Sequence, residues 1–509
     1  MFSMAFDYFI YYGWRQYFWP VVLPAIGLFL AVISFNFIRY SRLRVRRPKA
    51  TPVAVSDEAA AEVARYASGM IACRTVWRDD LTEEEAKPFL DLQNLIKNDY
   101  PNIFREMRRT LVDEYSIVYR WKGEGGRRPV LFLGHFDVLD AGEDSWSFAP
   151  FEGIAAEEFV YGRGALRCKG PMAAMMLAAE RLIESEFVPA CDIWFALLHA
   201  GESSTMAAER TAEWFKGQGI TFEAVFDEGG RLDMDTDIVK SPVAFVCVSE
   251  KNRICVKLTA KARPGFPASP PSHTAIGLIA EAIGRLEYAK FPIRLSGVIR
   301  TAVRTLSPYM NPATRLVVSN RWLFGRLFKR RVGLDSELGA IFRTTAAVTM
   351  VSGGQAEDEL PAEASAVVDL RLGADDGKND IEAYFKALLR GINVSHEVIY
   401  EGEKPYTADT DARLYHALEA AIYDCFGSIP SVPFVQSESS NGRVFEGLCR
   451  NIYRFTPIPV STDDVMRMRG QNERVRIKSL ARAVEFYAML YRYISSVRAA
   501  PDTAQKNEK

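Results

Sequence analysis

Apolar residues along this chain follow two spacings that alternate with one another. Three short apolar runs, which are typical of buried strands, lie at 130–133, 193–198 and 224–226. Three stretches of helical spacing lie at 56–70, 83–98 and 169–183. The alternation predicts an α/β fold, with a mixed sheet flanked by helices on both faces. His135, His199 and Asp227 stand at the ends of the predicted strands, where such sheets bind ligands.

A different pattern begins near residue 251. Alternation of apolar and polar residues predicts strands over 254–259 and 366–372, and helical spacing predicts helices over 273–286 and 380–389. These elements indicate a smaller α+β domain inserted into the larger one. The predicted organisation is a helix and basic linker over 1–50, the larger domain over 51–250 and 405–498, the inserted domain over 251–404 and a disordered tail over 499–509.

The run from Tyr17 to Ile38 contains no charged residue, and it is long enough to cross a hydrocarbon core of ~30 Å as a helix. A signal peptide is disfavoured, because no basic segment precedes the run and no small-residue cleavage site follows it. The downstream flank, 39–49, carries six Arg or Lys and no acid. By the positive-inside rule we expect a single-pass membrane protein whose large carboxyl-terminal part is cytoplasmic.

The composition narrows the choice of partners. Lys and Arg number 63 against 64 Asp and Glu, so the whole chain offers no electrostatic basis for binding nucleic acid. The seven Cys are scattered and never form a CxxC pair, which favours reduced thiols over a disulfide framework.

The stretch 321–331 is basic and apolar together. Such a segment either lies on a membrane surface or forms an ordinary amphipathic helix packed on its own domain. The sequence leaves both interpretations open and favours the second.

Several spaced motifs carry a family resemblance. They are Gly134-His135-x-Asp137-Val138, the Gly162-Arg163-Gly164-Ala165-Leu166 segment with Lys169-Gly170, Asp227-Glu228-Gly229-Gly230 and the late Gly470-Gln471-Asn472-Glu473. In this order they resemble the co-catalytic zinc peptidases that include aminoacylase, bacterial glutamate carboxypeptidase and, most similar, carboxypeptidase S. The resemblance implies a zinc-peptidase-like domain with an inserted lid or dimerisation domain, and hence a homodimer. It also implies a peptide or N-acyl amino acid as ligand.

In that family two zinc ions share one bridging carboxylate and a water, and a Glu acts as general base. The resemblance implies that His135 and Asp227 match ligands of the first zinc. Asp137 matches the catalytic-site carboxylate that orients His135. This part of the ancestral site is intact.

The rest of the site is altered. Arg167 stands where the bridging carboxylate is expected, and Arg469 stands where the last histidine ligand is expected. The favoured alignment places Glu202 on the second-zinc ligand and Gly201 on the general base. A shift of one residue makes Glu202 the base and loses the ligand instead.

The substrate side also departs from the family pattern. Phe266 stands where the oxyanion-stabilising His is expected, and His273 falls where the family begins a helix. Asp358 replaces an expected Asn. Arg371 and Arg443 are the remaining candidates for binding substrate.

We therefore predict a membrane-anchored pseudo-peptidase with a binding or regulatory role and at most one zinc ion. Arg167 and Arg469 should fill the former metal space beside Glu202, His135 and Asp227. One alternative is an active carboxypeptidase or N-acyl-amino-acid amidohydrolase with one metal on His135, Asp227 and either Glu202 or Cys168. Another is a purely structural homo-oligomer.

Overall fold

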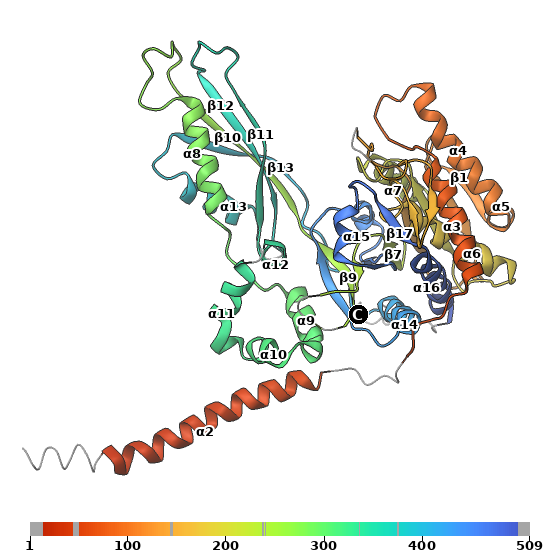
Figure 1. Ribbon diagram of the computed structural model, residues 1–509, viewed down its shortest axis with the longest axis horizontal. Coiled ribbons are helices and arrows are strands. Elements are labelled where there is room, and N and C mark those ends of the chain that lie inside the picture. Colours follow the sequence, from red (N-terminus) through yellow and green to blue (C-terminus); the bar gives the residue numbers. More distant parts are fainter. Residues whose placement is uncertain are drawn as a thin grey trace, which may run out of the picture.

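The structure is a computed structural model that describes residues 14–43, 50–142, 146–236, 239, 241–334, 336–373 and 376–496. The predicted tail, 499–509, lies outside the described residues. Figure 1 shows a larger domain, an elongated inserted domain and a long N-terminal helix beneath them.

The larger domain is built on a ten-stranded mixed sheet, and a three-stranded sheet lies beside it. In spatial order the path of the large sheet is β1 (Arg108–Leu111), β2 (Ile117–Trp121), β6 (Ile193–Leu198), β3 (Val130–His135), β7 (Ala224–Asp227), β15 (Ile452–Arg454), β9 (Val243–Glu250), β8 (Arg231–Asp233) and β16 (Pro459–Val460), with β14 (Ser431–Gln436) paired to β9. The small sheet consists of β17 (Arg474–Arg476), β5 (Phe159–Tyr161) and β4 (Ile154–Ala156).

Helices cover both faces of this sheet, which confirms the predicted fold class. One face packs against α3 (Asp57–Ala72), α4 (Glu83–Asp99), α5 (Pro101–Glu106), α6 (Lys169–Glu184), α14 (Arg413–Phe426) and α16 (Ile477–Ser496). The other face packs against α7 (Met206–Gly217) and the 3₁₀ helix η3 (Asn441–Gly447).

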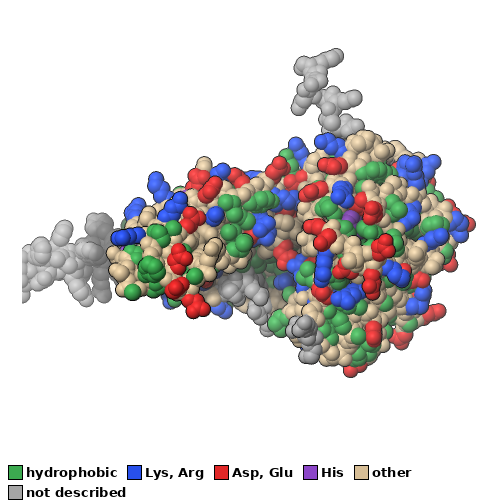
Figure 2. Space-filling view, turned by 90° about the horizontal axis from the view of Figure 1, so that it is seen from above, with side chains coloured by type: hydrophobic (Ala, Val, Ile, Leu, Met, Phe, Trp, Pro, Cys, Tyr) green, Lys and Arg blue, Asp and Glu red, His purple; other side chains and the backbone are tan. Residues whose placement is uncertain are grey.

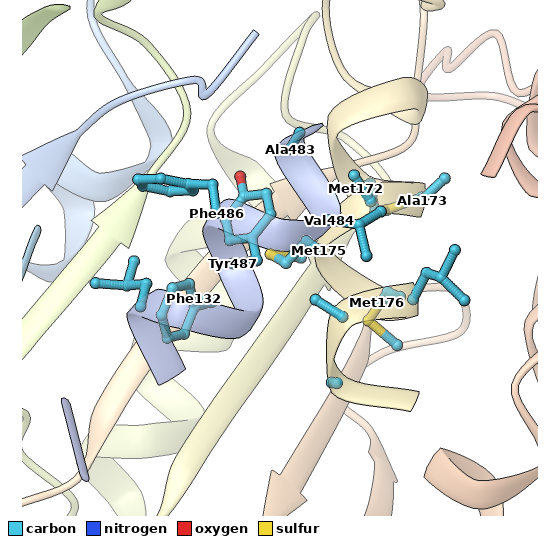
Figure 3. Packing of buried hydrophobic residues seen from close by; sticks show 14 of the residues in the cluster. Phe132, Met172, Ala173, Met175, Met176, Ala483, Val484, Phe486 and Tyr487 are labelled. Atoms are coloured by element: carbon cyan, nitrogen blue, oxygen red, sulfur yellow. The ribbon is translucent and has the colours of Figure 1, made fainter. Parts of the chain in front are cut away.

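Strand β3 shows how the core is divided between the faces. Its side chains alternate, so Phe132 faces the α6 and α16 side while Leu131 and Leu133 face α7. Figure 3 shows Phe132 with Met175 of α6 and Tyr487 of α16. Each such buried side chain contributes about 1.5–3 kcal/mol, so the strand whose end carries His135 is firmly fixed.

The inserted domain is a four-stranded antiparallel sheet with helices packed on it. Its strand order is β11 (Thr345–Gly353), β12 (Glu363–Arg371), β10 (Arg253–Lys261) and β13 (Val394–Glu401), and its covering helices are α8 (Ala275–Tyr288) and α13 (Lys378–Leu388). Between α8 and β11 the chain forms further helices, namely α9 (Gly297–Leu306), η2 (Ser307–Tyr309), α10 (Pro312–Ser319), α11 (Arg321–Leu334) and α12 (Ser336–Phe342). Of these, the sequence indicated only the segment at 321–331.

The N-terminal helix α2 (Trp14–Ser41) leaves its apolar side chains exposed. Leu28 is 69% exposed and Phe35 is 65% exposed, values that a core helix would not show. The part from Val21 to Ser41 is long and apolar enough to cross a membrane, a test that a signal sequence also passes.

Candidate functional site

The candidate site lies at the carboxyl ends of three neighbouring parallel strands. β3 lies between β6 and β7 in the sheet, and both pairings are parallel. His135 ends β3, Asp227 ends β7 and Glu202 lies in the loop after β6. Because these ends share one sheet edge, the predicted residues are brought together.

Asp137 organises the floor of the site. The carboxylate is buried, and it accepts backbone N–H bonds from Gly201 at 2.7 Å and from Glu202 and Ser203 at 3.0–3.2 Å. His135 Nδ1 donates to Asp137 Oδ1 at 3.1 Å. Burial would raise the pKa of Asp137, but His135 and the backbone donors lower it below the usual value. Asp137 therefore orients His135, as the sequence predicted, and also shapes the loop that carries Glu202.

Two arginines surround Glu202, whose side chain is only 3% exposed. Arg167 Nε lies 3.1 Å from Glu202 Oε2, and Arg469 Nε contacts Glu202 Oε1. Arg469 also pairs with Glu438 at 3.0 Å. Glu202 thus contacts the residues that replace the two other expected ligands of the second zinc, which favours the alignment that places Glu202 at that ligand position.

Glu228, rather than Asp227, faces His135. Glu228 Oε1 lies 2.8 Å from His135 Nε2, close enough for an ion pair although outside hydrogen-bond geometry, and 3.2 Å from Arg167 Nη1. Burial would lower the pKa of His135, but the charge of Glu228 raises it well above the usual value, so the imidazole is held protonated.

Asp227 is held by backbone N–H donors rather than by an arginine. Its oxygens accept backbone N–H bonds from Gly442 at 2.7 Å and from Glu228 at 2.9 Å. Burial raises the pKa of Asp227 to about 6. In the described part of the chain Asp227 forms no ion pair with Arg167 or Arg469. Asp227 ends β7, and it is the next residue, Glu228, that lies against His135 and Arg167.

The buried carboxylate of Glu473 joins the loop that carries Arg167 to the loop that carries Arg469. The sequence motif contained this residue but assigned it no role. Glu473 accepts backbone N–H bonds from Leu166 and Arg167 at 3.1 and 3.0 Å and from Arg469 at 3.3 Å. Arg163 Nη1 lies 3.4 Å from the same carboxylate. The Gly-Gln-Asn-Glu motif was the available signal, and Glu473 is the residue in it that holds the loops together.

The side chains present do not fit a two-metal centre. The carboxylate oxygens nearest His135 Nε2 belong to Glu202 at 3.4 Å and Glu228 at 2.8 Å, and both are the atoms that Arg167 binds. A metal ion would therefore compete with a guanidinium for its ligands and be repelled by that charge. Within the described residues no group of three His, Cys, Asp or Glu is arranged to hold a metal.

Gly201 leaves no room for a catalytic side chain in this arrangement. A Cβ at this position would lie 2.5 Å from His135 Cβ and 2.7 Å from Asn441 Nδ2. Both distances are far below van der Waals contact, so restoring a glutamate here would require the loop to move.

Within the described residues, no hydrogen bond or ion pair joins Phe266, His273 or Arg443 to Glu202 or to its two arginines. Phe266 is 78% exposed in the loop after β10, and His273 is an exposed residue that precedes α8. Arg443 pairs with Glu250 at 3.1 Å and donates to Asn252 at 3.0 Å, which ties it to the junction between the domains.

Arg371 and Cys168 are the last two candidates. Arg371 pairs with Asp369 of its own strand at 3.0 Å and reaches Ser439 of the larger domain at 3.4 Å. Burial raises the pKa of the Cys168 thiol to about 12, so the thiol is protonated at neutral pH when no metal is bound.

The larger domain has a mixed sheet with polar side chains at the carboxyl ends of its strands, and an α+β domain is inserted into its chain. These features define the class of zinc-peptidase-like proteins. The sequence pattern of Peptidase family M20/M25/M40 matches residues 131–493, and this chain belongs to that family. It is thus a member of a hydrolase and carboxypeptidase family, as the motifs predicted.

Individual relatives agree with this assignment. The human N-fatty-acyl-amino acid synthase/hydrolase PM20D1 is 29% identical over 386 residues, which cover 75% of this chain and 77% of the relative. Probable carboxypeptidase S-like 2 of Dictyostelium discoideum is 28% identical, with 78% of each chain covered. The crystal structure of human carnosine dipeptidase 1 shares the fold, with a TM-score of 0.61 at 14% identity over 92% of this chain and 99% of that one.

Proposed function

We propose that this chain is a membrane-anchored member of the family that has lost the two-metal reaction and acts as a binding or regulatory protein. The observation that carries the proposal is the position of Arg167, which binds the two carboxylate oxygens that face His135. Loss of a general base alone typically lowers rate by ~10²–10⁴, and Gly201 supplies none. The ligand class we propose is a peptide or N-acyl amino acid, since relatives with related sequences are named for such compounds.

Metal content of the full-length chain, purified in detergent and equilibrated with zinc, tests this proposal. We expect far less than one zinc per chain, and no hydrolysis of N-acyl amino acids. The double variant Arg167→Asp/Arg469→His restores two of the expected ligand types, so it should bind zinc, and His135→Ala in that background should abolish the binding. The double variant should remain inactive, because Gly201 provides no side chain that could act as general base.

The opposite result would support an active hydrolase with a reduced metal site. Stoichiometric zinc in the unaltered chain, lost in His135→Ala together with hydrolytic activity, would overturn the pseudo-peptidase proposal. Unchanged activity in His135→Ala would indicate a contaminating enzyme and leave the metal result to decide.

Helix α2 supports the membrane part of the proposal. Its apolar side chains are exposed along the helix, and such a surface needs an apolar environment. The basic flank at 39–49 supports, by the positive-inside rule, a cytoplasmic position for the large domains. Resistance of the membrane-bound protein to alkaline carbonate tests the anchor, and protease protection in sealed vesicles tests the side. Release by carbonate or cleavage of the N-terminal helix would contradict the anchor.

We also propose a homodimer through the inserted domain. β11 is an edge strand of that domain's sheet, and Met350 and Val351 on it are 66% and 64% exposed. Mass measurement in detergent should give two chains for the unaltered protein and one for a Val351→Lys variant. A monomeric unaltered protein would refute this part alone.

A further inference from the structure

Residues 289–334, which we call the helical arm, have an unusual charge composition. The arm comprises α9, η2, α10 and α11 with the segment before them, and it contains ten Lys or Arg and no Asp or Glu. The whole chain is nearly balanced, at 63 basic and 64 acidic residues. Of the ten cations only Arg294 forms an ion pair within the described residues, with Asp376 and Asp380. The arm is therefore a cationic surface without internal compensation.

The arm is joined to α2 by specific polar contacts. Asn36 Nδ2 donates to Asn320 Oδ1 at 3.1 Å, and Asn320 Nδ2 donates to the carbonyl of Ile33 at 3.3 Å. Arg315 Nη1 donates to Ser41 Oγ at 3.1 Å. Asn320 is fully buried, and although its Nδ2 also donates to Leu316 O and Ser319 Oγ within the arm, its Oδ1 accepts from Asn36 of α2. Figure 1 shows α10 beside the carboxyl-terminal half of α2.

The contact surface on α2 is a single stripe. Ile33, Asn36, Phe37 and Tyr40 are partly buried, and their spacing of three and four residues places them on one helix face. Neighbours such as Phe35 remain exposed. One face of α2 thus binds the arm, while the other faces are free for lipid.

The arm meets α2 at a depth inside the apolar run. The ring of Trp322 lies 5.5 Å from the ring of Phe29, edge to face. Phe29 is nine residues before Ile38, the last residue of the uncharged run, which corresponds to about 13 Å along a helix. If α2 spans a core of ~30 Å, the start of α11 lies at the level of lipid rather than of bulk water.

The exposed face of α11 has the chemistry that such a position requires. Trp322 is 58% exposed, and Leu323, Leu327 and Leu334 are 41%, 55% and 74% exposed. The three leucines are four and eleven residues apart, so they share one face of the helix. The basic side chains of α11 are exposed around them and can extend their charges to the headgroup level while their stems cover apolar surface: Arg326, Lys329, Arg330 and Arg331.

The opposite side of the molecule differs. Figure 2, which looks onto the side away from α2, shows acidic and basic side chains interspersed over both domains. The one-signed charge composition of the arm is therefore not shared by that side of the molecule. Each Lys or Arg near an anionic leaflet changes membrane partitioning by about fivefold.

We infer that the helical arm is a second membrane contact, which inserts the leucine face of α11 beside α2 and binds anionic lipid headgroups through its Arg and Lys side chains. The inference rests on the proposed membrane anchor. Its consequence is that the inserted domain is held at the membrane at two points, so its orientation relative to the membrane is fixed.

The test uses the full-length chain in nanodiscs of phosphatidylcholine alone or mixed with phosphatidylserine. A nitroxide spin label is attached to Cys in the Leu327→Cys variant, since the native Cys residues are buried or partly buried. Phe266→Cys, in the loop at the other end of the inserted domain, is the matched control. Collision with oxygen and with a nickel chelate reports depth. We expect the label at 327 to be immersed in lipid in the mixed discs and the label at 266 to be aqueous.

The charge contribution is tested in the same assay. In the triple variant Arg326→Gln/Lys329→Gln/Arg330→Gln, the label at 327 should move toward water in mixed discs. The partition coefficient of the labelled segment between lipid and water should fall on the order of a hundredfold. Changing the exposed Lys97 and Lys478 to Gln should cause no shift.

The outcomes separate the two proposals. An aqueous label at 327 in a protein that resists carbonate extraction would overturn the membrane contact and leave the anchor standing. Release by carbonate would overturn the anchor and the contact together. Equal immersion with and without phosphatidylserine would overturn headgroup binding by the arm.

Discussion

Replacing Arg167 with Met should destabilise the larger domain markedly, because its guanidinium neutralises two carboxylates that water scarcely reaches. The side chains of Glu202 and Glu228 are 3% and 11% exposed. Removing one partner from a buried ion pair typically costs about 3–5 kcal/mol. Glu202 keeps Arg469 and Glu228 keeps His135. We therefore expect the lower end of this range, about 3 kcal/mol.

The assay is thermal unfolding of the full-length protein in detergent or nanodiscs. Unfolding entropy is about 2.1 cal/mol/K per residue, so for a domain of roughly 300 residues a loss of 3 kcal/mol lowers Tm by about 5 °C. Arg105→Met is the matched control, since Arg105 pairs with Glu106 on the surface, where the side chains are 66% and 52% exposed. An exposed pair contributes ~0–1 kcal/mol, which corresponds to less than about 2 °C.

A second variant separates charge from packing. In Arg167→Met/Glu202→Gln/Glu228→Gln two buried negative charges are removed together with one cation, while Arg469 keeps Glu438 and His135 keeps Asp137. Replacing buried charged partners together by uncharged groups is often nearly neutral. We expect most of the lost Tm to return. If Arg167→Met lowers Tm no more than Arg105→Met does, or if the triple variant is less stable than Arg167→Met, the ion-pair explanation is refuted.

Three further changes test other parts of the structure. Gly201→Ala should cost about 1–3 kcal/mol through crowding of His135, and an unchanged denaturant midpoint would show that the loop is free to move. Glu473→Gln should loosen the loops that carry both arginines and speed their cleavage by protease, whereas cleavage elsewhere stays as it was; equal cleavage of variant and unaltered protein would contradict this. Burial lowers the pKa of Lys251 to about 8, whereas the pKa of Lys in an unfolded chain is ~10.4. Between these two pH values the unfolded state binds more protons than the folded state, so stability should rise with pH from about 8 to about 10. Lys251→Met should flatten that rise, as measured by Tm against pH, and an identical slope in the variant would assign the rise to other groups.

Long periodic segments were predictable from the sequence. The apolar run at 130–133 became β3, the helical spacing at 169–183 became α6, and the alternation at 254–259 became β10. These elements bury one or both faces, so their hydrophobic period reports their structure directly. The ends of such strands also located the site, since parallel neighbours bring their carboxyl ends together.

The orientation of individual carboxylates was not predictable in the same way. Asp227 and Glu228 are adjacent, and which of them turns toward His135 depends on the backbone donors of Gly442, more than two hundred residues away in sequence. The contact of Asn36 with Asn320 joins residues that are even further apart in sequence. Tertiary hydrogen bonds of this kind leave no periodic signal.

The charges at the site show how the fold neutralises its buried acids with its own side chains. A buried carboxylate such as Glu202 needs a cation, because desolvating an unpaired charge is far more costly than any single packing contact. Arg167 and Arg469 together supply two positive charges, the same charge as one zinc ion, and both reach Glu202. The buried acids are thus neutralised by groups that are part of the chain. Returning only Arg167 to a carboxylate would add one negative charge and remove one positive charge beside Glu228 and Asp137. The arginines and the retained acids are therefore one interdependent unit, and under the proposed function a two-metal site would require several of its members to change together.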